Sequence, residues 1–173
     1  DKVRKVGWSS GSRNYSCRNF SFQAQNAVAL IRQNISDVRI FEPVETAQYP
    51  NGSTVSGQGA IDWVSLSVNA RDFPLSVPNA TRRNQLKTRY ASDGKREPVA
   101  RSFVVIQTKD GRLFLSEAMD TGSGVKPGWI DWRIGNTSTE IKYFHALGRA
   151  VKAYCFTFDD PNMTYEKVLA NSK

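Results

Sequence analysis

The chain has 173 residues with 39% hydrophobic content, including nine Phe, six Tyr and four Trp, which is enough for one domain with one core. This composition excludes an intrinsically disordered chain, and no apolar run reaches the roughly 20 residues of a membrane-spanning helix. The formal net charge of +8 favours polyanionic or acidic partners. We expect a single domain over residues 1–173, with a flexible arm at 1–12.

The first half of the chain changes from a helical to an alternating pattern. Apolar residues at helical spacing predict a first helix at about 21–35. Alternating apolar and polar residues then predict strands at 37–44 and 60–68. We interpret the polar, basic stretch from Pro78 to Pro98 as a long loop.

The second half carries clearer local signals. Lys109-Asp110-Gly111 lies between two apolar runs, an arrangement typical of a β-hairpin. "WIDWRI" at 129–134 and "AVKAYCFTF" at 150–158 predict two more strands. Thr137 followed by Glu140 predicts a capping box at the start of a second helix. Two helices and about six strands with short links indicate an antiparallel α+β domain.

Cysteine usage and glycosylation motifs favour a secreted protein. A disulfide between Cys17 and Cys155 would close a long loop and stabilise the fold by about 4–5 kcal/mol, although two unrelated buried thiols are the alternative. The chain has seven Asn-x-Ser/Thr motifs, whereas about two are expected by chance. These sequons begin at Asn14, Asn19, Asn34, Asn51, Asn79, Asn136 and Asn162. We expect a mature secreted form whose signal peptide has been removed.

No catalytic or cofactor motif stands out. The single histidine, His145, falls inside the second predicted helix, so the chain lacks an evident base for a Ser or Cys nucleophile. No Cys, His or carboxylate spacing fits a zinc site, and no glycine-rich phosphate loop follows a strand. We expect no metal and no cofactor.

The basic stretch is the strongest binding signal in the sequence. Its cations could neutralise phosphates, and its tyrosine could stack on a base. The candidate polyanion-binding residues are Arg82, Arg83, Lys87, Arg89, Tyr90, Lys95 and Arg96. The alternative is a solvated loop whose charge serves solubility alone.

The order of several short motifs resembles a known family. Tyr15-Ser16-Cys17 before a helix, Tyr49-Pro50, "ARDFPL" at 70–75 and the segment 100–124 resemble the small fungal microbial ribonucleases. They are closer still to the ribonuclease-like (RALPH-type) secreted effectors of plant-pathogenic fungi. The resemblance covers about residues 13–134. It implies an N-terminal helix packed on a twisted antiparallel sheet and a disulfide from the first cysteine to the last, with an extra C-terminal helix and strand.

The same resemblance implies that catalysis has been lost. The position of the catalytic glutamate matches Asp72, while Asn51 and Asp120 replace the two histidines. Arg101 lies near the position of the phosphate-binding arginine and joins the candidate RNA-binding residues. Because an aspartic acid of ordinary pKa near 4 is a poor proton donor at neutral pH, we expect the protein not to be an enzyme.

The expected function is therefore that of a secreted virulence effector with a catalytically inactive ribonuclease-like fold. It would bind host RNA or a host protein, with a plant immune receptor among the candidate partners, and could be delivered into host cells. We expect a monomer without membrane insertion. The alternatives are an extracellular structural subunit, similar to the globular part of a pilin, and an active ribonuclease that uses Asp72 with Arg101.

Overall fold

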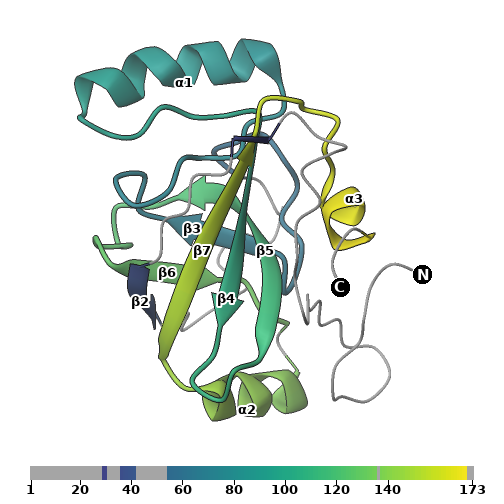
Figure 1. The fold of residues 1–173 in the computed structure, drawn as a ribbon. Coiled ribbons are helices and arrows are strands. Elements are labelled where there is room, and N and C mark those ends of the chain that lie inside the picture. The colour runs from purple at the N-terminus through teal and green to yellow at the C-terminus, as the bar shows by residue number, and fades with distance from the viewer. Residues whose placement is uncertain (1–28, 31–35, 42–53, 136, 171–173) are drawn as a thin grey trace.

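A computed structural model describes residues 29–30, 36–41, 54–135 and 137–170, and every statement below concerns those residues. They form an α+β fold with a mixed sheet and three short helices (Figure 1). The strands are β1 (Ala29–Leu30), β2 (Ser36–Phe41), β3 (Ser65–Val68), β4 (Arg101–Gln107), β5 (Leu113–Thr121), β6 (Trp129–Trp132) and β7 (Ala150–Phe158). The helices are α1 (Ala80–Ser92), α2 (Ser138–Leu147) and α3 (Tyr165–Ala170).

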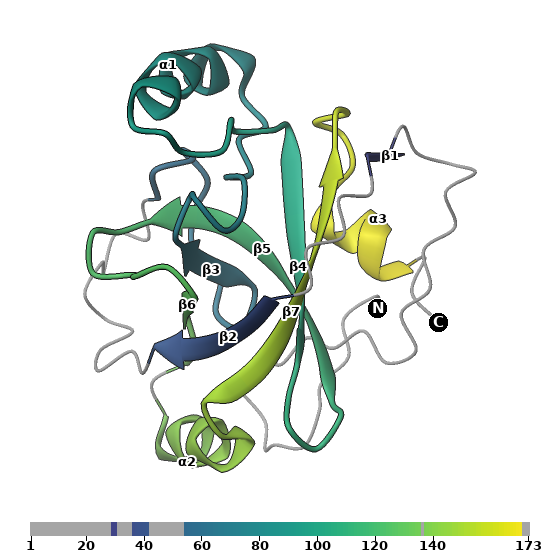
Figure 2. The ribbon, with the colours of Figure 1, turned by 60° about the vertical axis from the view of Figure 1, so that its left-hand side comes forward.

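The sheet curls until the last strand in its order pairs with the second. The order is β1-β7-β2-β6-β3-β5-β4, and β4 also pairs with β7, which makes the curvature visible in Figure 2. β2–β6 and β3–β5 are parallel, so the prediction of an antiparallel sheet is wrong for these pairs. Hairpins give antiparallel neighbours, but α1 and β4 lie between β3 and β5 in the chain, and this crossover is long enough for a parallel return.

Elements with strong local signals are confirmed. β4 and β5 form the expected hairpin, and Gly111 takes the positive φ of +85° that the turn requires. β3 and β6 lie within predicted strands, β7 coincides with one, and β2 overlaps the strand predicted at 37–44 but begins one residue earlier. At the start of α2, Thr137 Oγ1 accepts a hydrogen bond from the Glu140 backbone N–H at 3.2 Å, while the Glu140 carboxylate accepts one from the Thr137 backbone N–H.

Two predicted elements are corrected. Ala29–Leu30 form β1, paired with the end of β7, so a helix over 21–35 is wrong at these two residues. The rest of that helix, like the arm at 1–12, lies outside the described residues. The stretch 78–98 contains helix α1 in place of a long loop. Only Leu86 and Tyr90 are buried on this helix, and such a narrow apolar stripe gives a weak periodic signal.

The core fills the inside of the curled sheet, with α1 and α2 at its opposite ends (Figures 1 and 2). Trp63 and Trp132 are 0% exposed and meet edge to face, with ring centroids 5.1 Å apart. Trp63 Nε1 donates a hydrogen bond to Glu140 Oε1 at 3.0 Å, which ties α2 to the core. β4 and β5 are buried on both faces, whereas in β6 Ile130 and Trp132 are buried and alternate with the half-buried Trp129 and Asp131.

Candidate active site

Three adjacent strands bring two carboxylates and a hydroxyl into one row. The register pairs Ser67 of β3 with Asp120 of β5 on one side and with Asp131 of β6 on the other. All three residues are half-buried, whereas Leu66 and Ile130 beside them are 0% exposed. The three side chains therefore lie on the outer face of the sheet, and we call them the carboxylate row.

A β-bulge places Asp120 in this row. β3 and β5 pair Leu66 with Ala118 and then Ser67 with Asp120, so Met119 is an extra residue on β5. Without the bulge, Ser67 would stand opposite Met119, and Asp120 would point to the other face of the sheet. The local irregularity thus aims this carboxylate at the same face as Asp131.

The β5–β6 connection is held by side chains that follow β3. Asp72 Oδ2 accepts a hydrogen bond from the Gly128 backbone N–H at 2.7 Å. Asn69 Nδ2 donates one to the Val125 carbonyl oxygen at 2.9 Å. Asp72, the expected remnant of a catalytic base, thus supports the segment that joins the two strands carrying the acids.

The two acids of the row have different surroundings. Among the described residues no donor reaches the Asp131 carboxylate, and burial, with the charge of Asp120 as a second cause, raises its pKa to about 6. Burial also raises the pKa of Asp120, but the backbone N–H groups of Val55, at 2.9 Å, and Thr121 oppose this shift. Asp131 therefore retains its proton to a higher pH than an ordinary aspartic acid, whereas backbone N–H groups favour the charged form of Asp120.

Helix α1 flanks the row on the side of Asp120. The Val55 backbone N–H binds Asp120, and the Val55 carbonyl oxygen accepts a hydrogen bond from Arg82 Nε at 3.0 Å. The Tyr90 hydroxyl lies 3.3 Å from Thr121 Oγ1, and burial raises the pKa of this tyrosine. A cationic helix thus stands beside the acidic site.

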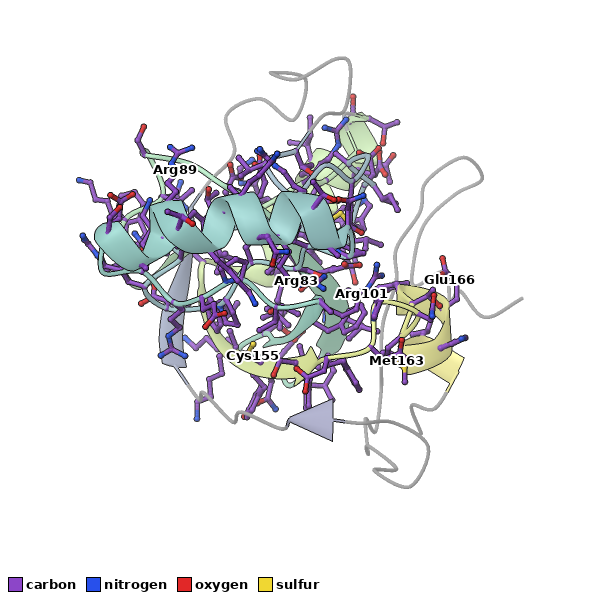
Figure 3. All side chains as sticks on the ribbon, turned by 90° about the horizontal axis from the view of Figure 1, so that it is seen from above. Arg83, Arg89, Arg101, Cys155, Met163 and Glu166 are labelled. Carbon is purple, nitrogen blue, oxygen red and sulfur yellow. The ribbon has the colours of Figure 1, made fainter. Side chains whose placement is uncertain are left out.

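The predicted basic residues of α1 are only partly available to a ligand. Arg83 donates to the Val77 and Pro78 carbonyl oxygens at 2.7 and 3.2 Å, and Lys87 pairs with Glu97 at 3.0 Å. Arg89 is exposed near the C-terminal end of the helix. Figure 3 shows Arg83 and Arg89 at separate positions along α1.

The remaining candidates lie off this helix. Lys95 pairs with Asp93 at 3.4 Å, and Arg96 Nε donates to the Arg71 carbonyl oxygen at 2.9 Å. Arg101 is only 8% exposed, and its guanidinium binds the Glu117 carboxylate at 3.1 Å. The expectation that Arg101 serves at an RNA-binding surface is therefore corrected, because this side chain is occupied by a buried ion pair.

Glu117 is the centre of that buried network. Its Oε2 accepts hydrogen bonds from Ser76 Oγ at 2.7 Å and from Gln58 Nε2 at 3.1 Å. Burial raises the pKa of Glu117, and the charge of Arg101 acts in the opposite direction. This network holds the segments before and after β3 against β5, although Arg101 Nε is buried without a hydrogen-bond partner among the described residues.

The other predicted site residues lie apart from the row. Cys155 is buried on β7, with its Sγ 3.5 Å from Ser102 Oγ (Figure 3), while Cys17 and Asn51 lie outside the described residues, so the disulfide stays a prediction. His145 is exposed in the last turn of α2.

In the described ranges no three His, Cys, Asp or Glu side chains gather as metal ligands would. No helix within those ranges is long and apolar enough to cross a membrane.

Sequence reasoning missed two of the three residues of the row. It treated Asp120 as a degenerate position and passed over Ser67 and Asp131. The available signal was an acidic residue inside the alternating strand "WIDW", because aspartate is depleted in strands.

Comparisons of the chain with protein families, curated proteins and solved structures found no match.

Proposed function

We propose that the protein cleaves glycosidic bonds by acid–base catalysis, with Asp131 as general acid and Asp120 as general base. The observation that carries the proposal is the carboxylate row across β5, β3 and β6. Glycoside hydrolysis commonly uses two carboxyl groups, one protonated and one ionised, on either side of the scissile bond. The unlike surroundings of the two acids support this division of roles.

The spacing of the strands favours a mechanism with a water molecule between the acids. Two interstrand steps separate the Cα atoms of Asp120 and Asp131 by roughly 10 Å. Inverting glycoside hydrolases hold their carboxyl groups about 6.5–9.5 Å apart, which leaves room for the attacking water. Side chains on one face of a sheet stand roughly perpendicular to it, so carboxyl groups on these two strands lie closer to this range than to the roughly 5–5.5 Å of retaining enzymes or the roughly 3 Å of a dyad that shares one proton.

The proposed reaction moves two protons. Asp131 gives its proton to the glycosidic oxygen as the bond from this oxygen to the anomeric carbon breaks. Asp120 takes a proton from the water whose oxygen forms the new bond to that carbon. Exchange with solvent then restores both carboxyl groups. Trp129, on the same face of β6 two residues before Asp131, offers a half-buried ring against which a sugar could pack.

The test is the release of reducing ends from a panel of neutral and acidic polysaccharides. We expect Asp131→Asn and Asp120→Asn each to lower the rate by about 10²–10⁴-fold, the usual contribution of a positioned acid or base. The rate of the wild type should fall as pH rises through about 6, because Asp131 then loses its proton. Asp159→Asn, which alters an exposed carboxylate after β7, is the control.

A leaving group of low pKa sharpens the assignment. Aryl glycosides with such a leaving group need little protonation, so Asp131→Asn should retain far more activity on them than Asp120→Asn does. If neither variant changes the rate of bond cleavage by the folded protein, the row is not the catalytic site. If the folded wild type releases no reducing ends from any polymer, the proposed reaction is wrong.

A second candidate is the function expected from the sequence, a secreted and non-catalytic ribonuclease-like effector that binds host RNA or a host protein. The exposed Arg89 on the cationic helix α1 favours it. Titration of labelled RNA at low and moderate salt, with a denaturing gel of the same samples, tests it. Salt-sensitive binding without cleavage, weakened by Arg89→Ala, would support this candidate, and no binding at low salt would refute RNA binding.

A further inference from the structure

A cationic pocket opens next to the carboxylate row. It has a volume of about 750 Å³ and is lined by the β4–β5 turn, the β5–β6 connection and the start of β7, within the usual range of about 300–1,000 Å³ for ligand pockets. Among the eleven described residues that line it, three are cations and none is Asp or Glu. The cations are Lys109, Arg149 and Lys152, all exposed.

The acid that follows Lys109 in the chain is engaged outside the pocket. Asp110 follows Lys109, but its carboxylate pairs with Arg112 at 2.6 Å and accepts a hydrogen bond from Thr108. These bonds lower the pKa of Asp110 to about 2, with the Arg112 contact as the main cause. Asp110 is therefore engaged by Arg112 and Thr108 and is not among the described residues that line the pocket.

Trp129 connects the pocket to the acids. Its ring lines the pocket, and Lys126 Nζ lies 5.2 Å from the ring centroid. Trp129 and Asp131 occupy the same face of β6, since Ile130 between them points into the core. Two residues along a strand span roughly 7 Å, so a polymer chain seated on Trp129 would extend directly over Asp131.

We propose that this pocket binds the acidic groups of an anionic polysaccharide, which is then the substrate class of the carboxylate row. This inference rests on the proposed function. Lysine and arginine side chains bind carboxylate and sulfate groups through charge-assisted hydrogen bonds. The cationic helix α1 stands at the opposite end of the row, beside Asp120, so a polymer crossing both acids meets positive charge on each side.

A polyanion of sugars fits these features better than a nucleic acid. The half-buried carboxylates would lie under the middle of the bound chain, and Asp120 would repel a phosphate there. A polysaccharide with one acidic group per unit or fewer can place a neutral glycosidic linkage over the acids and its charges over the pocket.

The experiment measures binding and cleavage separately with matched polymers. The Asp131→Asn protein is titrated with polygalacturonate and with its fully methyl-esterified form, and with dextran sulfate and neutral dextran. The two acidic polymers distinguish a uronate from a sulfate ligand. The pocket variant Lys109→Ala/Lys152→Ala is compared with Lys142→Ala/Lys167→Ala, which removes the same charge from exposed positions on α2 and α3.

We expect an acidic polymer to bind and its neutral counterpart to bind far less. The pocket variant should bind the acidic polymer about tenfold or more weakly than its parent. The control variant Lys142→Ala/Lys167→Ala should change the affinity by less than about twofold. The inference would be overturned if the wild type cleaved a neutral polymer and both double variants bound the polymers with equal affinity. That result would leave the proposed function standing. Pocket-dependent binding of an acidic polymer that the wild type never cleaves would refute the catalytic proposal alone. Tighter binding of RNA through the same two lysines would overturn the assignment to a polysaccharide.

Discussion

Replacing Asp131 by asparagine should stabilise the folded protein at neutral pH while it removes the proposed acid. The carboxyl group is half-buried without a donor among the described residues, and its pKa is raised from 3.8 to about 6 by burial and then by Asp120. A carboxyl group with a higher pKa in the folded state binds its proton more tightly there. Its stabilising contribution is therefore complete below pH 3.8 and is lost as pH rises through about 6.

The size of the effect follows from the shift. A change of roughly two pKa units corresponds to about 3 kcal/mol in the free energy of unfolding, which is an upper bound because the carboxyl group still contacts solvent. Screening by that solvent reduces the expected gain for Asp131→Asn at pH 7.5 to about 1–2 kcal/mol. For a chain of this size, the melting temperature should rise by roughly 2–8 °C. At pH 4, where the native group is already protonated, the two proteins should melt together.

The assay is thermal unfolding followed by circular dichroism between pH 4 and pH 8, for the wild type, Asp131→Asn and the exposed control Asp159→Asn. The stability gain should grow between pH 4 and pH 7 only for Asp131→Asn. A melting-temperature difference that does not change with pH, or a variant less stable than the wild type at pH 7.5, would refute the burial argument for this carboxyl group.

Three further substitutions test the packing that supports the site. Arg101→Met leaves Glu117 buried without its ion-pair partner and should lower the free energy of unfolding, measured in urea, by about 3–5 kcal/mol. Adding Glu117→Gln should recover part of this loss. A loss below about 1 kcal/mol for Arg101→Met would contradict a buried ion pair. A Cβ at Gly135 would collide with the Glu140 carboxylate, so Gly135→Ala should cost about 1–3 kcal/mol in the same assay, and an unchanged midpoint would show that Glu140 moves freely. Thr137→Ala removes the cap of α2 and should cost about 1 kcal/mol, whereas Thr137→Ser should retain most of the stability; equal losses in both variants would rule out the hydroxyl as the cause.

The sequence by itself determined the elements whose signals are local. The Asp110-Gly111 turn between apolar runs specifies the β4–β5 hairpin. The turn requires a positive φ at Gly111, which glycine adopts without steric cost. Thr137 and Glu140 specify the start of α2 because a capping box satisfies helix-end donors within four residues. Helix α1 escaped prediction since its capping residue, Asn79, precedes a segment in which only two residues are buried.

The tertiary structure decided which strands are neighbours, and with this the candidate site. Asp120 and Asp131 belong to consecutive strands of the chain, yet they are not adjacent in the sheet, because β3 inserts between β5 and β6. The order of strands and the bulge at Met119 arise from how distant segments bury their apolar faces together. Neither is encoded within a short window of sequence, so a carboxylate that looked like a lost histidine becomes half of an acid pair only when β3 lies between β5 and β6.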